Sequence, residues 1–345
     1  MMQKWKYGLL SGGGIAAAVL LLSFLLITFV GGNVSLALFS FFQGIFGSVY
    51  SIGEVLVKTV PLMLAGLGVS VAFRTGIINL GAEGQIYMGA IAASFIATQF
   101  TGLPGFLMIP LCLLGGFLLG GIWSVIPGFL KARFGISEVI NTIMFNYIAI
   151  YIVGILVRTL LQDPNNAFPM SETFPEASWL PNLLAGSRLH MGLILALVMM
   201  FLVWGLLWHT TYGYEMRAVG ENPRASACAG ISLNRNILLS SLISGGLAGL
   251  AGVSEVTGLH HKLMEGISPN YGYLAVIVAL LGRNHPFGVL IAALGLAMLQ
   301  VGSLSMQRNA GIPTSISSII LAAIVLLILA SNHLVSKRKL ARKEG

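Results

Sequence analysis

The chain has 345 residues, of which 56% are hydrophobic and only 9% are charged. This composition excludes an ordinary soluble domain and indicates an integral membrane protein. The formal net charge of +8 is better explained by the orientation of the chain in a bilayer than by binding to a nucleic-acid polymer, because the basic residues are distributed unevenly over the predicted loops.

Apolar runs that are long enough to cross a bilayer, about 20 residues each, recur along the chain. They predict an all-α integral membrane protein with about ten transmembrane helices, organised as a single polytopic domain over residues 1–345. The predicted spans are residues 8–30, 55–73, 82–99, 104–130, 138–161, 189–209, 237–258, 271–282, 286–307 and 312–332. The eighth of these is too short for an upright span, which favours a re-entrant or tilted helix that ends at the break before Pro286.

The Lys and Arg residues determine the predicted topology. With an even number of spans and the N-terminus inside, 14 of the 19 basic residues fall in cytoplasmic segments and 5 in external segments. An excess of basic residues on the cytoplasmic side is typical of membrane proteins. We therefore expect both termini to be cytoplasmic, with a basic tail at residues 333–345 that lies near the anionic lipid surface.

A polar stretch separates the second and third spans. Residues 73–85 read Phe-Arg-Thr-Gly-Ile-Ile-Asn-Leu-Gly-Ala-Glu-Gly-Gln. A carboxylate at membrane depth costs about 2.5–3.5 kcal/mol on insertion scales, so it needs a partner, a cavity or a function. The three glycines let the backbone leave helical geometry, which is tolerated only where protein or water covers the freed polar groups. The stretch therefore predicts a broken helix near residues 76–85 that lines a path through the membrane.

Small residues recur in the fourth and seventh spans. Gly116 and Gly120 are four residues apart, as are Gly245 and Gly249. This spacing places both glycines of a pair on one face of a helix and permits a close approach of two helices. We expect these positions to mark tight packing within the bundle.

The fifth span has a polar face. Glu138, Asn141, Thr142 and Asn146 fall within an arc of about 140° when residues advance by 100° each. Such a face points into the bundle or a wet cavity. Two interpretations remain open: the side chains line the path and bind a polar solute, or they join helices through hydrogen bonds of about 0.6 kcal/mol each. Gln300 in the ninth span adds a polar group to the candidates for a central path.

Two longer polar loops connect the spans. The external loop at about residues 162–188 contains four prolines, and is either a lid or docking surface for an extracellular partner or a solvated connector. In the cytoplasmic loop at about residues 210–236, Asn222 is a good helix N-cap, Pro223 suits the first helical position, and Gly230 suits the end. A short helix is therefore predicted there, and it must pack on something because helices shorter than about 12–15 residues are marginal in water.

Three stretches resemble one family. Asn79-Leu-Gly-Ala-Glu-Gly-Gln85 is similar to the signature of the permease subunits of ABC importers that move ribose-like sugars, branched-chain amino acids and nucleosides, and is most similar to the nucleoside (simple-sugar-like) permeases. Gly220 to Ile231 resembles the family's coupling helix, which docks on the ATPase subunit. Gly282-Arg-Asn-His-Pro-Phe-Gly288 resembles its Gly-Arg-Asn-x-Pro-x-Gly turn. The resemblance extends from about Ser51 to Ser331.

The resemblance implies a transport function and its parts. The chain would be the permease subunit of an ATP-driven importer in a bacterial cytoplasmic membrane, and would form the path for a nucleoside or a related sugar-containing solute. Its partners would be an ABC ATPase subunit, a second permease chain (homologous or identical) and an extracytoplasmic solute-binding protein. Together with the polar face of the fifth span and Gln300, the candidate residues for the path or gate are Asn79, Glu83, Gln85, Asn141, Asn146 and Gln300. Those implied for coupling to the ATPase are Gly220, Glu221, Asn222, Pro223, Arg224, Ala225 and Gly230.

The chain is not expected to be an enzyme. The phosphate-binding pattern Gly-x4-Gly-Lys-Ser/Thr does not occur in the sequence, so ATP and magnesium would bind to the partner ATPase, and we expect neither a cofactor nor a metal in this chain. Two alternatives to a nucleoside importer remain: an ABC permease for ribose, simple sugars or branched-chain amino acids, and an ion-coupled secondary transporter that acts alone. The latter requires a relay of intramembrane carboxylates, for which the candidates are Glu83, Glu138 and Glu255.

Overall fold

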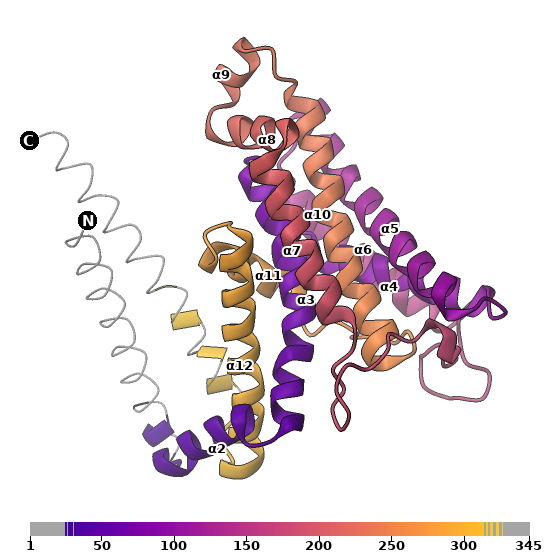
Figure 1. The fold of residues 1–345 in the computed structure, drawn as a ribbon, viewed down its shortest axis with the longest axis vertical. Helices are drawn as coiled ribbons and strands as arrows, with labels where there is room; N and C mark the ends of the chain where they lie inside the picture. The colour runs from indigo at the N-terminus through magenta and orange to yellow at the C-terminus, as the bar shows by residue number, and fades with distance from the viewer. Residues whose placement is uncertain are drawn as a thin grey trace, which may run out of the picture. The chain divides into compact units, whose positions relative to one another are not determined.

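The structure is a computed structural model that describes residues 31–313 together with residues 25, 27–29, 315, 316, 318, 319, 322, 323 and 326. The predicted spans 8–30 and 312–332 therefore lie largely outside the described residues, and the basic tail 333–345 lies wholly outside them. Every named element in the described part is a helix, which confirms the all-α fold class (Figure 1).

The chain divides into two compact units, of which the smaller comprises residues 1–55 and 297–345. Its described part contains α2 (Val34–Phe46), the beginning of α3 and the end of α12. Asn33 begins α2, because its side-chain oxygen accepts a hydrogen bond from the backbone N–H of Leu36 at 3.1 Å. The sequence analysis predicted no helix here, since 13 residues are too few to cross a bilayer.

The larger unit comprises residues 56–296. Its helices are α3 (Val49–Arg74), α4 (Ala82–Gln99), α5 (Gly105–Phe134), α6 (Glu138–Leu156), α7 (Gly192–His209), α8 (Thr211–Glu221), α9 (Pro223–Cys228), α10 (Leu233–Glu255), α11 (Tyr271–Leu281) and the first part of α12 (Pro286–Ala310). The predicted bounds of α4 are confirmed. The predicted bounds of α3, α6 and α7 were wrong by three to six residues at one end, as helix ends often are.

Six helices in the described part of the chain are long and apolar enough to cross a membrane: α3, α5, α6, α7, α10 with the π-helical turn Val256–His260 that extends it, and α12. The predicted number of about ten is therefore confirmed only in part. The 11 residues of α11 extend roughly 16 Å, about half of the hydrocarbon thickness, at 1.5 Å per residue. This confirms that the run 271–282 is too short for an upright span.

The centre of the larger unit is formed by α4, α5 and α10, which pack on one another through glycines. A Cβ atom on Gly120 would lie 2.6 Å from the backbone oxygen of Gly245 and 2.8 Å from the Cα atom of Gly249. The close approach predicted from the spacing of the glycines is therefore confirmed: α5 and α10 touch backbone to backbone.

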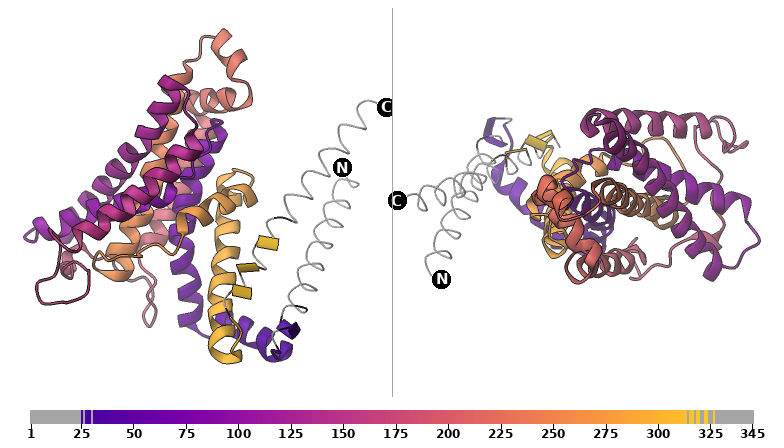
Figure 2. Two further views of the ribbon diagram at one scale, coloured as in Figure 1. Left: turned by 180° about the vertical axis from the view of Figure 1, so that it is seen from behind. Right: turned by 90° about the horizontal axis from the view of Figure 1, so that it is seen from above.

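The two ends of the larger unit carry different loops. Figure 1 shows α8 and α9 at one end and the loop between α6 and α7 at the other, and the view from behind in Figure 2 agrees. This loop is held by the segment after α10: the N–H groups of Ser171 and Phe174 donate to the backbone oxygens of Leu263 and His261, each at 2.8 Å. Within the larger unit, the external loop predicted at about residues 162–188 thus lies with the segment after α10, at the end opposite α8 and α9.

We expect Gly120→Ala to destabilise the protein by about 1–3 kcal/mol, because the added methyl group meets backbone atoms that cannot rotate away. Gly205→Ala in α7 is the matched control, since a Cβ atom there has no neighbour within 4 Å and alanine is favoured over glycine in a helix by about 1 kcal/mol. Thermal unfolding in detergent measures both. Equal stability of the two variants would contradict the backbone contact of α5 and α10.

Candidate functional site

The break between α3 and α4 consists of residues 75–81, and the hydrogen bonds of Asn79 fix its conformation. The side chain of Asn79 is 3% exposed. Its Oδ1 atom accepts from the N–H of Gly81 at 2.8 Å, and its Nδ2 atom donates to the hydroxyl of Ser244 in α10 at 2.8 Å. Asn79 and Gln85 also exchange two amide hydrogen bonds, each of 3.1 Å. The break is thereby joined to both α4 and α10.

Asn146 in α6 satisfies the polar groups on the other side of the break. Its Oδ1 atom accepts from the N–H of Gly84 at 2.8 Å, and its Nδ2 atom donates to the backbone oxygen of Leu80 at 2.9 Å and to the hydroxyl of Tyr273 at 3.1 Å. Asn146 is fully buried. The expectation that protein covers the backbone groups freed by the break is therefore confirmed at these positions.

Glu83 lies in the first turn of α4 and faces the beginning of α11. Its Oε2 atom accepts from the N–H of Gly272 at 2.7 Å, and the side chain also hydrogen-bonds with Ser268. A carboxylate at a helix N-terminus satisfies backbone donors that have no partner inside the helix and interacts favourably with the helix dipole. A Cβ atom on Gly272 would clash with the backbone of Glu83, so only glycine permits this contact.

The structure brings four of the six predicted path residues together: Asn79, Glu83, Gln85 and Asn146. Asn141 lies on the same helix as Asn146, but its Nδ2 atom is buried with no hydrogen-bond partner among the described residues. Gln300 belongs to the smaller unit, where it is half-buried on α12. Ser244, Gly272 and Tyr273 also contact these residues, and no motif in the sequence singled them out.

We call Asn79, Glu83, Gln85, Asn146, Ser244 and Tyr273 the break cluster. The four members predicted for the path are each at most 3% exposed. Their side chains form hydrogen bonds with one another, with neighbouring hydroxyl groups and with the backbone. In this conformation the cluster therefore joins four helices, α4, α6, α10 and α11, around the break.

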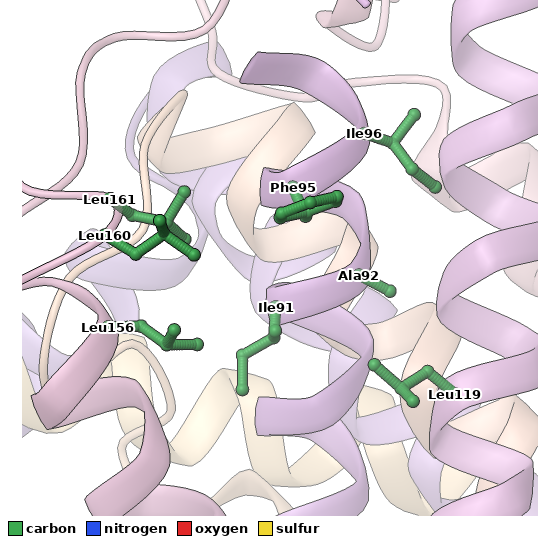
Figure 3. Close-up of a pocket in the computed structure, with 8 residues that line it drawn as sticks. All are labelled: Ile91, Ala92, Phe95, Ile96, Leu119, Leu156, Leu160 and Leu161. Atoms are coloured by element: carbon green, nitrogen blue, oxygen red, sulfur yellow. The ribbon is translucent and has the colours of Figure 1, made fainter. Parts of the chain in front are cut away.

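A pocket of about 420 Å³ lies between α4, α5 and the end of α6 (Figure 3). Its lining residues are Ile91, Ala92, Phe95, Ile96, Leu119, Leu156, Leu160 and Leu161. All eight side chains are apolar, so the pocket matches the chemistry of a lipid chain and offers no side-chain hydrogen bond to a polar solute.

The cytoplasmic loop predicted at residues 210–236 contains the short helix that its sequence predicts. Helix α9 runs from Pro223 to Cys228; the side chain of Asn222 accepts from the N–H of Ala225 at 3.1 Å, and Gly230 has a φ of +81° after the last turn. The remainder of the loop forms α8, which was not predicted. Among residues 221–230 Ser226 is buried and the others are exposed, which leaves α9 with little packing of its own.

These features define a polytopic helical membrane protein. Residues 51–329 match the family described as branched-chain amino acid transport system / permease component. The chain belongs to this family, which confirms the family resemblance of its motifs.

Individual relatives are named after several solutes. The chain is 39% identical over 305 residues to the guanosine ABC transporter permease protein NupP of Bacillus subtilis (strain 168), with 87% of each chain covered. It is 38% identical to the nucleoside ABC transporter permease protein NupB of Lactococcus lactis subsp. cremoris (82% of this chain and 80% of that one). It is 33% identical to the glucose ABC transporter permease protein TsgB13 of Haloferax volcanii (82% and 77%). No solved structure matches the chain significantly.

We expect Asn146→Ala to lower the melting temperature in detergent by about 5–10 °C, because it leaves one buried and two partly buried polar groups without a partner, at a cost of about 1–3 kcal/mol for the buried one and less for the others. Asn141→Ala is the matched control: it removes the same amide from the same helix, where the Nδ2 atom is already unpaired, and should change the melting temperature little. A similar loss in both variants would show that the break cluster does not depend on Asn146.

Proposed function

We propose that this chain is the transmembrane permease subunit of an ATP-driven importer for nucleosides. The observation that carries the proposal is its similarity to relatives named for guanosine and nucleosides, at 39% and 38% identity, over most of each chain. The relative named for glucose is similar at 33% identity, so a simple sugar is the second candidate solute.

The energy for transport comes from a separate ATPase in this proposal. The chain has no Gly-x4-Gly-Lys-Ser/Thr pattern, and α9 presents exposed side chains at one end of the larger unit, beyond α8 (Figure 1). A six-residue helix is far too short to be stable without a partner. Its caps and its exposure fit a coupling helix that rests in a groove of the ATPase and carries Glu221, Asn222 and Arg224 to that surface.

The remaining parts of the importer follow the family. Two permease chains, identical or homologous, enclose the path between them, and an extracytoplasmic solute-binding protein delivers the nucleoside at the end opposite α9. Closure of the ATPase domains around ATP and magnesium drives the permeases between outward-open and inward-open states. The chain forms and breaks no covalent bond of the solute. Both termini lie in the cytoplasm.

The solute is tested with the assembled importer. The tagged chain is purified in mild detergent together with its co-eluting partners, and mass spectrometry identifies these partners. The assembly is then reconstituted in liposomes, with ATP on the side of the membrane where the ATPase lies. We expect ATP-dependent uptake of guanosine at least ten times faster than uptake of glucose. Faster uptake of glucose would favour the sugar importer. Uptake by the chain alone without ATP would overturn the proposal in favour of a secondary transporter.

The coupling role of α9 is tested by charge reversal. Arg224→Glu should abolish ATP-dependent uptake, because it places a carboxylate at the surface that contacts the ATPase, while the chain still inserts in the membrane. Arg133→Glu is the control, since Arg133 is an exposed basic residue in the last turn of α5 and does not belong to the loop that contains α9. Normal uptake by Arg224→Glu would remove α9 from the coupling surface.

A further inference from the structure

Helix α11 is bound at both ends by charged residues that flank the break. Glu83 binds the N–H of Gly272 at the beginning of the helix. Arg74, the last residue of α3, binds the other end: its Nε atom donates to the backbone oxygen of Asn284 at 2.9 Å, and one of its terminal nitrogens donates to that of Arg283 at 3.2 Å. An anion at the N-terminus and a cation at the C-terminus are the arrangement that a helix dipole favours.

The turn that Arg74 holds is under backbone strain. Arg283 and Asn284 have φ values of +53° and +52°, a left-handed conformation that is unfavourable for arginine and is better tolerated by asparagine. The side-chain oxygen of Asn284 is buried with no hydrogen-bond partner among the described residues. The turn is closed by its own backbone hydrogen bonds, from Arg283 to Leu280 and from Asn284 to Ala279, and the two hydrogen bonds of Arg74 connect it to α3.

The same arginine is in contact with the cytoplasmic loop. Gly220, the penultimate residue of α8, packs on the backbone of Arg74 and Gly76 so closely that a Cβ atom on it would clash with the backbone oxygen of Arg74. The charge of Arg74 interacts with Glu221, which attracts it, and with Arg217, which repels it. Movement of α8 therefore displaces the backbone of Arg74 and changes the field around its guanidinium.

Two rings complete the surroundings of the guanidinium. Its carbon lies 5.4 Å from the centre of the Trp208 ring, a contact that holds a cation in place. The ring of His285, in the turn, lies 4.7 Å from that of Trp208. Burial and, to a lesser extent, the charge of Arg74 lower the pKa of His285 below its usual range, so the turn presents an uncharged imidazole to Arg74 at neutral pH.

We propose that Arg74 is the positioning residue that transmits the movement of α8 and α9 to α11. The proposal rests on the importer function above and identifies the element that the ATPase moves. The contact of Glu83 with Gly272 is close and rigid, so it serves as the fixed point of α11. The strained turn at the other end moves with Arg74, and α11 tilts relative to the break when the coupling helix shifts.

The test separates ATP hydrolysis from transport in the reconstituted importer. Arg74→Gln keeps the coupling helix and the path, but removes the cation and the planar pair of donors. We expect the variant to co-purify with the ATPase and to hydrolyse ATP within twofold of the unmodified importer, while uptake falls at least tenfold. The number of ATP molecules hydrolysed per solute imported should therefore rise at least fivefold.

Two further variants make the test decisive. Arg133→Gln removes an exposed arginine from the last turn of α5 and should leave the ratio of hydrolysis to uptake unchanged. Arg74→Lys retains the charge but not the fork of donors, and its ratio should lie between those of the unmodified importer and Arg74→Gln.

The possible failures are distinguishable. An unchanged ratio in Arg74→Gln overturns the proposal, as does loss of hydrolysis and uptake together, which would assign Arg74 to assembly. If Arg74→Gln does not fold, an unchanged ratio in Arg74→Lys overturns it. Absence of ATP-dependent uptake in the unmodified importer would instead overturn the importer function itself.

Discussion

The fixation of α11 at its two ends, by hydrogen bonds from Arg74 and to Glu83, is the interaction on which the larger unit depends. Arg74 and Glu83 stand on either side of the break, and each binds the end of α11 whose partial charge it complements. A helix of 11 residues cannot span a bilayer, so its ends lie where unpaired backbone groups would be costly. Because the chain leaves helical geometry at residues 75–81, the side chains of Arg74 and Glu83 both reach the ends of α11. A continuous helix through these residues would place the two side chains elsewhere.

The break itself persists because its polar groups have partners on three neighbouring helices. Asn79 donates a hydrogen bond to Ser244 in α10 and exchanges amide hydrogen bonds with Gln85 in α4. Asn146 in α6 donates to the backbone oxygen of Leu80. Such a network specifies one arrangement, since shifting any one helix would leave a buried donor or acceptor unpaired.

Much of this architecture could be predicted from the sequence, and the exceptions have physical reasons. The glycines of residues 73–85 indicated the break, and Asn222, Pro223 and Gly230 indicated α9, because local backbone chemistry acts within a few residues. Partners distant in sequence could not be predicted in this way: Arg74 was interpreted as a topological charge, and its binding to residues 283 and 284 depends on how α3 meets α11. Helix α2 was missed because bilayer length was the criterion, and α8 because its polar sequence has no such signal.

The backbone contact of α5 with α10 has a consequence for motion. Where Gly120 meets Gly245 and Gly249, no side chain lies between the helices that could change rotamer and let them slide. Helix α4 packs on both, and we therefore expect these three helices to behave as one rigid body during transport. In the proposed transport cycle, α11 then tilts against these three helices, and they keep their positions relative to one another.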